Sequence, residues 1–338
     1  MKINCSANNR IYIFFILLFL VRANVSLAQD PEFSQYYANP IYTNPAFAGS
    51  SGIGRMVTDV RNQWSNITGS FRTISASYDE HYDVINGGIG IMLTGDEAGT
   101  GLLQTISLTG IYSYQINISR YVTMRAAVQG SIVQKSISFG KLTFFDQIAL
   151  RQGFVYNTNE TPIAANVFYP NVAAGAVIYT SKFYGGVAVH NINEPVNAFY
   201  STDSDNAKKL STVPIRYTVH AGLVIPLVQT KDPKNESNLW PNIMYMQQST
   251  FAQLNIGLYY NKGPFVLGMY YRQTSSNGDA LIGLVGIRLQ KLRIGYSYDQ
   301  TISNAYYGAT NSHEITVAFD LRKRIPKKTI RAIKCPEF

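Results

Sequence analysis

Apolar and polar residues alternate along most of this chain, in segments of about ten residues separated by turn residues. The segment TISLTGIYSYQI at 105–116 is the clearest, with Ile106 and Leu108 on one face and Ser107 and Thr109 on the other. Successive residues of a strand point to opposite faces, so such segments favour strands over helices. The pattern predicts an all-β protein, a transmembrane antiparallel β-barrel.

The number of alternating segments predicts how the barrel closes. We expect about 14 strands, near 52–63, 69–80, 86–95, 102–117, 120–140, 170–180, 183–190, 213–226, 239–247, 251–261, 264–273, 280–290, 291–300 and 313–322. An even number returns both ends of the barrel to the periplasm, and closure removes sheet edges that a bilayer cannot hydrate.

The connections between these strands differ in length. Three long connections, 141–169, 191–212 and 301–312, fall on one side and are expected outside the cell. The turns on the other side are short except 228–238, where the count could be wrong by one hairpin.

The two ends of the chain are unlike the body. Lys2 and Arg10, the apolar run 11–21 and Ser26-Leu27-Ala28 indicate a secretory signal at 1–28, with cleavage expected after Ala28. That run is shorter than the roughly 20 residues of a membrane-spanning helix, and no longer one follows. We therefore expect residues 51–322 to form the barrel.

Composition supports export to a membrane. The chain is 46% hydrophobic and only 14% charged, with 24 Tyr and 26 Gly, whereas about 25% charged residues is usual for soluble domains. A soluble secreted β-sandwich is the alternative. Aromatic residues near the expected strand ends predict interfacial girdles, among them Trp240, Tyr259, Tyr260, Tyr270 and Tyr271.

The positive charge is concentrated at the C-terminus. From Arg322 onward there are seven basic residues and one acid, Glu337, so we expect a basic periplasmic tail at 323–338. Such a tail could bind anionic lipid headgroups or an acidic protein patch, and export argues against nucleic acid. Cys335 is the only cysteine beyond the signal, so no intramolecular disulfide is expected. It could be reactive, pair with a second chain or be inert.

Ionisable residues also fall on the polar, inward phase of the expected strands, where they commonly pair with one another. They are Asp59, Arg61, Arg125, Arg216, Arg288, Arg293, Asp299 and Asp320. They could line an ion-selective pore or fill the lumen as a paired lattice. We favour a narrowed lumen that also contains residues 29–49.

Catalytic chemistry finds little support. Only His190 and His220 are histidines on expected strands, and neither lies in a recognisable catalytic motif. Acidic residues cluster at 79–83, but neighbouring strand residues diverge and do not easily share a metal. We predict no catalytic site, no metal site and no cofactor.

The stretch after the signal, QDPEFSQYYANPIYTNPAFAG at 29–49, contains Pro31, Pro40 and Pro45. Each proline lacks a backbone donor and restricts the residue before it. We therefore expect an irregular N-terminal arm at 29–50, in the periplasm, and no helix within it. A plain linker is the alternative.

Several short motifs occur in order along the chain. They are Phe33-Ser34-Gln35-Tyr36, Asn39-Pro40, Asn44-Pro45-Ala46-Phe47-Ala48-Gly49, Arg61-Asn62-Gln63-Trp64, GDEAG at 95–99, YSY at 112–114, GVAVHNINEP at 186–195 and Cys335-Pro336-Glu337-Phe338. Together they resemble the PorP/SprF family, outer-membrane proteins of the type IX secretion and gliding machinery of Bacteroidetes. The resemblance spans the whole mature chain.

The resemblance implies a non-enzymatic outer-membrane protein that binds, anchors or helps deliver secreted adhesins. Its implied partners are the C-terminal domain of a secreted surface protein, a periplasmic peptidoglycan-binding lipoprotein and outer-membrane lipid. Both termini are expected in the periplasm. The alternatives are a passive or substrate-specific solute porin and a purely structural membrane protein. The candidate partner-binding residues are Phe33, Gln35, Tyr36, Asn39, Pro40, Asn44, Pro45, Arg61, Trp64, His190, Pro195, Cys335, Pro336 and Phe338.

Overall fold

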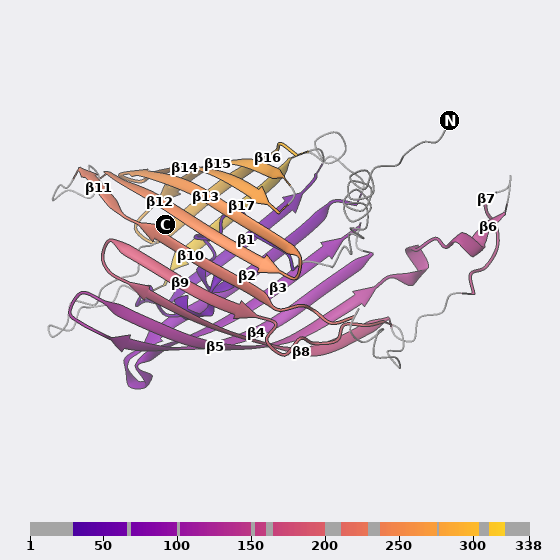
Figure 1. Cartoon of the computed structure of the whole chain (residues 1–338), viewed down its shortest axis with the longest axis horizontal. Helices are drawn as coiled ribbons and strands as arrows, with labels where there is room; N and C mark the ends of the chain where they lie inside the picture. The colour runs from indigo at the N-terminus through magenta and orange to yellow at the C-terminus, as the bar shows by residue number, and fades with distance from the viewer. Residues whose placement is uncertain are drawn as a thin grey trace, which may run out of the picture.

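The fold is known from a computed structural model, in which nearly all of the described chain belongs to one antiparallel sheet (Figure 1). The structure describes residues 30–65, 69–99, 102–149, 153–159, 165–199, 211–228, 237–275, 277–303 and 311–321. No helix in these ranges is long and apolar enough to cross a membrane.

The sheet closes into a barrel whose wall is formed by consecutive, mostly long strands. These are β1 (Arg55–Gln63), β2 (Phe71–Tyr82), β3 (Gly87–Ala98), β4 (Leu103–Asn117), β5 (Thr123–Ile137), β8 (Asn166–Tyr179), β9 (Phe183–His190), β10 (Arg216–Leu223), β11 (Ile225–Val228), β12 (Ser237–Gln248), β13 (Phe251–Lys262), β14 (Phe265–Thr274), β15 (Gly278–Arg288), β16 (Leu292–Thr301) and β17 (Ser312–Asp320). β1 pairs with β17, and β10 joins β9 to β12. Because β10 and β11 both pair with β12 as one interrupted strand, the described wall has the 14 strands predicted.

Side chains alternate across the wall as the sequence pattern requires. On β3, Ile89, Ile91 and Leu93 face outward, while Gly90 and Met92 face the interior and are buried. Tyr259 and Tyr270 correct the prediction of an outer girdle, because both are buried in the lumen, and Trp240 also packs inward against the same cluster. Tyr259 and Tyr270 are each next in sequence to another tyrosine, and adjacent strand residues must face opposite sides.

The two rims of the barrel differ. We call one the short-turn rim, where strands are joined by 83–86, 118–122, 180–182, 263–264 and 289–291, and by the longer connection 229–236 between β11 and β12. It also carries the 3₁₀-helix η2 (Asp83–Ile85), the start of β1 and the end of β17. The opposite, long-loop rim carries the connections 138–165, 191–215 and 302–311.

One long loop has structure of its own and projects from the barrel at the right of Figure 1. It contains the 3₁₀-helices η3 (Phe139–Lys141) and η4 (Phe145–Gln147) and a hairpin of β6 (Ile148–Ala149) and β7 (Gly153–Phe154). Asp146 braces it by accepting hydrogen bonds from the Thr158 hydroxyl and the Asn159 backbone N–H.

Residues 30–54, which we call the luminal arm, lie inside the barrel. The arm contains two short helical turns, α2 (Pro40–Thr43) and η1 (Pro45–Phe47), where we expected none. In each, proline is the first residue, a position that needs no backbone donor and suits its fixed φ. The Asn44 side chain caps η1 by accepting a hydrogen bond from the Ala46 N–H at 2.9 Å.

The hydrophobic core is therefore formed between the arm and the inner wall. One cluster packs Ile41, Phe47 and Ala48 of the arm against residues such as Met92 and Val177. A second packs Tyr36 and Ala38 against apolar residues of the wall, including Met244, Tyr259, Tyr270, Ile282 and Leu284.

Candidate functional site

The arm–wall interface begins with Asp30 at the long-loop rim. The Asp30 N–H donates to Gln248 Oε1 at 3.1 Å, at the end of β12. Asn191, just beyond β9, donates from Nδ2 to Asp30 Oδ2 at 2.9 Å, and Arg216 of β10 pairs with the same oxygen at 3.5 Å. The first described residue of the arm is thus tied to three strand ends of one rim.

A buried ionic cluster holds the next part of the arm. Glu314 of β17 accepts from the backbone N–H groups of Ser34 at 2.7 Å and Gln35 at 2.8 Å. Arg61 of β1 pairs with Glu314 at 3.4 Å and with Asp299 of β16 at 3.2 Å, and it donates to the Ser34 hydroxyl.

The same cluster extends to β14 and β15. Arg272 pairs with Asp299 at 3.1 Å and with Asp279 at 2.7 Å. The Ser34 hydroxyl donates to Asp299 Oδ2 at 2.5 Å, so the arm completes the environment of this carboxylate. Removing one member of a buried ionic network leaves an uncompensated charge, which costs about 3–5 kcal/mol. The network therefore specifies where this part of the arm lies.

Polar contacts continue at mid-depth. The Tyr36 hydroxyl donates to Asn242 Oδ1 at 2.7 Å. Asn44 Nδ2 lies within hydrogen-bond distance of the carbonyl oxygens of Ala176 (3.2 Å) and Val187 (3.0 Å) and of His220 Nε2 (3.1 Å). Gly175 provides the space, because a Cβ there would lie 2.1 Å from Asn44 Oδ1.

The arm ends at the short-turn rim. The Ala48 carbonyl accepts from Ser113 Oγ at 2.6 Å and Arg125 Nη1 at 2.8 Å. The Gly49 N–H donates to Asp79 Oδ2 at 2.7 Å, and Arg55 makes two bonds of 2.9 Å to the same carboxylate. These contacts hold the arm where it leads into β1.

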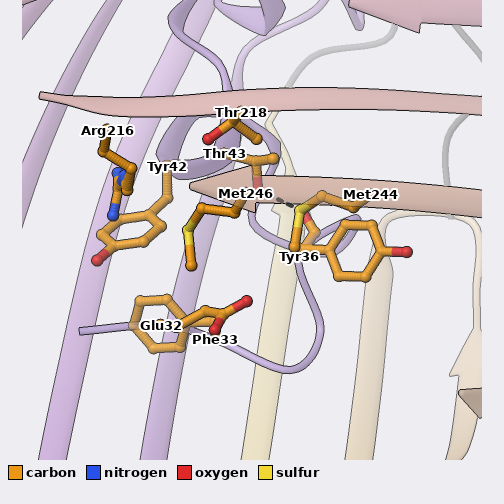
Figure 2. A pocket seen from close by; sticks show the side chains of 9 residues that line it. All are labelled: Glu32, Phe33, Tyr36, Tyr42, Thr43, Arg216, Thr218, Met244 and Met246. Carbon is orange, nitrogen blue, oxygen red and sulfur yellow. Dashed lines mark hydrogen bonds between the residues drawn. The ribbon is translucent and has the colours of Figure 1, made fainter. Parts of the chain in front are cut away.

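A small pocket remains beside the arm near the long-loop rim, as Figure 2 shows. In it the Arg216 guanidinium lies 5.9 Å from the centre of the Tyr42 ring. Its lining residues are Glu32, Phe33, Tyr36, Tyr42, Thr43, Arg216, Thr218, Met244 and Met246. Its cavity volume of about 20 Å³ gives room for about one water molecule, far less than a solute site needs.

Glu32 lies at the edge of this pocket and accepts a hydrogen bond of 2.5 Å from Gln253 Nε2. The half-buried carboxyl is thus held in place by one amide of β13.

The structure brings most of the candidate residues together in the lumen. The arm residues Phe33, Gln35, Tyr36, Asn39, Pro40, Asn44 and Pro45 lie against the wall, and Arg61 of β1 contacts the arm at Ser34. His190 joins them, with Nε2 3.4 Å from the Thr43 carbonyl. Trp64 and Pro195 lie apart, at the long-loop rim. Cys335, Pro336 and Phe338 lie outside the described residues.

This placement corrects the idea of an arm exposed in the periplasm. Gln35 and Asn44 are 0% exposed and Phe33 is 1% exposed, because they fill the space between the strands. In this conformation a partner outside the barrel cannot reach them. The preference for a lumen that contains the arm agrees with the structure.

Two wall residues that receive the arm, Glu314 and Arg272, are absent from the residues predicted above. Both lie on the inward phase of their strands, which is the sequence signal that could have identified them. Arg288, which was singled out, lies at the end of β15 and is exposed. In the described part of the chain, no three His, Cys, Asp or Glu residues are placed to hold a metal ion.

A closed wall with an apolar outer face and a polar, charged inner face defines a transmembrane β-barrel of the bacterial outer membrane. A family model described as type IX secretion system membrane protein PorP/SprF matches residues 25–319. The chain belongs to this family. No curated protein matches it.

Several solved structures are similar to this chain at low sequence identity. The outer membrane protein Omp33 of Acinetobacter baumannii is 8% identical, with a TM-score of 0.43, and the match covers 81% of this chain and 100% of Omp33. The toluene transporter TodX of Pseudomonas putida is 10% identical, with a TM-score of 0.45 and coverage of 86% and 94%. A Pseudomonas aeruginosa FadL homologue is 11% identical, with a TM-score of 0.42 and coverage of 83% and 98%.

Proposed function

We propose that this protein binds secreted surface proteins at the outer membrane and anchors them or helps deliver them, without catalysis. The observation that carries the proposal is the luminal arm, which contacts the wall from one rim to the other. A diffusion pore needs an open lumen, whereas an attachment protein needs only a rigid barrel and exposed loops. We propose that the bound protein is a secreted adhesin, which is held through its C-terminal domain.

The structured loop at the long-loop rim supports a binding role. Its exposed apolar side chains include Phe145, which is 90% exposed, Tyr156, which is 61% exposed, and Val155. Aromatic residues supply much of the binding energy of protein interfaces. Because η4 and the Asp146 hydrogen bonds give this loop a defined shape, it can present these side chains without a large ordering cost.

We also propose a periplasmic partner, a peptidoglycan-binding lipoprotein of the secretion machinery, contacted through the basic tail at 323–338. β17, which leads into the tail, ends at the short-turn rim. Outer-membrane lipid surrounds the apolar outer wall.

The test is capture from outer membranes in mild detergent, with an affinity tag placed in a loop other than 138–165. The full-length protein should capture a large surface protein, and the double variant Phe145→Ser/Tyr156→Ser should lose most of that capture. The control is Val84→Ser, because Val84 is 96% exposed but lies on the short-turn rim.

Two outcomes would count against the proposal. Equal capture by all three proteins would mean that the loop is not the binding surface. A barrel isolated without partners, with steady conductance in planar bilayers, would favour the solute porin instead.

A further inference from the structure

The order of contacts along the arm shows that it runs through the barrel from rim to rim. Asp30 contacts the ends of β9, β10 and β12 at the long-loop rim. Ser34 then meets Glu314, the third residue of β17 from that rim. Tyr36 and Asn44 bind at mid-depth, and Gly49 binds Asp79, close to the opposite end of β2.

The lengths of the connections show which rim faces outward. In bacterial outer-membrane barrels the short turns face the periplasm and the longer loops face the outside. The three longest connections, 138–165, 191–215 and 302–311, all lie on the other rim, so the rim where β1 begins and β17 ends is periplasmic. The rim that holds Asp30 has the long loops and is therefore external.

We propose that the amino-terminal end of the arm is displayed at the outer mouth of the barrel, on the cell-surface side. The expected cleavage after Ala28 leaves one residue before Asp30, so the mature amino terminus would emerge there. This proposal differs from the prediction of a periplasmic N-terminus, although the first and last strands do begin and end at the short-turn rim. This inference does not depend on the proposed attachment function.

This direction of the arm is required by its contacts, which would not form if the arm ran the other way. If the arm entered from the periplasm and ended inside, Asp30 could not reach Arg216, Asn191 and Gln248, which lie beside the long loops. A polypeptide bound to the long loops would therefore lie close to Asp30, the outer end of the luminal arm.

The experiment is thiol labelling of intact cells with a membrane-impermeant maleimide, in full-length protein carrying Cys335→Ser. Gln29→Cys places a thiol at the arm's end. Phe145→Cys is the control for the outer side and Val84→Cys, which is as exposed, is the control for the periplasmic side. The mass of each purified chain shows whether the signal was removed after residue 28.

We expect Gln29→Cys to label in intact cells to the extent of Phe145→Cys, while Val84→Cys stays near background until the outer membrane is permeabilised. Labelling of Gln29→Cys only after permeabilisation would overturn the proposal. If that thiol proves unreactive in both conditions, a flexible epitope inserted after Ala28 decides. Antibody binding to intact cells supports the proposal, and binding only after permeabilisation refutes it.

Discussion

Single glycines of the wall set how closely the arm can lie. Gly175 of β8 faces Asn44, and Gly88 of β3 faces the Ala48 carbonyl, which would be 2.2 Å from an added Cβ. On β13 and β14 the same device is internal to the wall. Tyr270 covers its register partner Gly257, and Tyr259 covers Gly268. In each case the glycine lacks a side chain, and a polar group or an aromatic ring occupies the space that a Cβ would need.

Gly175→Ala should displace the arm. Its Cβ would overlap the Asn44 amide, and overpacking of this kind costs about 1–3 kcal/mol. We expect a lower thermal unfolding midpoint in detergent, measured by circular dichroism, and faster proteolysis within residues 30–49. Gly110→Ala is the matched control, because an added Cβ there meets nothing within 4 Å. Equal midpoints for the two variants would contradict the close approach.

Arg61→Met should be more damaging than a change of charge at the surface. It leaves Glu314 and Asp299 without one of their cations in a buried setting, where breaking a pair costs about 3–5 kcal/mol. The measurement is urea unfolding in detergent or vesicles. Arg72→Met on the exposed face of β2 is the control and should change the free energy of unfolding little. Similar losses in both variants would show that the cluster does not stabilise the fold.

At the scale of elements, the arm is a plug built from irregular backbone. Some of its backbone polar groups bond to the side chains of Glu314, Asp79, Arg125 and Ser113, and others bond to one another in turns, without a strand ladder. The wall is closed independently by ladders that include β1–β17 and β10–β12. The arm and the wall can therefore be separated experimentally.

Deletion of residues 30–49 should open the lumen without destroying the barrel. We expect the wild-type protein to show little conductance in planar bilayers and the deletion variant to show steady ionic conductance, since polar and charged side chains then line an unfilled interior. Retained heat-modifiable migration on gels would show that the wall is intact. If neither protein conducts, the side chains of the wall close the lumen without the arm.

At the scale of the whole molecule, the two rims offer surfaces of different chemistry. The long-loop rim presents apolar side chains such as Phe145 and Tyr156, whereas β17 ends at the short-turn rim and is followed in the sequence by seven basic residues. This polarity suits a protein that meets one partner outside and another in the periplasm.

Truncation after Leu321 should remove capture of the periplasmic lipoprotein and leave capture of the surface protein unchanged, because the excess positive charge lies beyond that residue. Capture should also weaken as ionic strength rises. Cys335→Ser serves as the control that separates a charge effect from a covalent link. If the truncated chain captures the lipoprotein as well as the full-length chain, the tail is not its binding site.

Features of the fold that depend on neighbouring residues in the sequence could be predicted, whereas those that depend on contacts between distant residues could not. Alternation is a local property, so the sequence alone predicted 14 strands, the faces of segments such as 105–116, and the inward position of Arg61, Arg125 and Asp299. The sequence analysis placed Tyr259 and Tyr270 wrongly in an outer aromatic girdle. The alternation of faces along their strands puts both on the inward side. Helix was also excluded at Pro40 and Pro45, although proline at a first helical position is favourable.

The sequence by itself predicted the class of fold, since period-two alternation in segments of about ten residues, low charge and a secretory signal are together typical of an outer-membrane barrel. Only the tertiary structure decided where the arm lies and in which direction it runs. The arm has no periodicity, and its contacts join residues as far apart as Ser34 and Glu314, separated by 280 positions. Such contacts exist only after the wall has closed and brought the strands that hold the arm to one place.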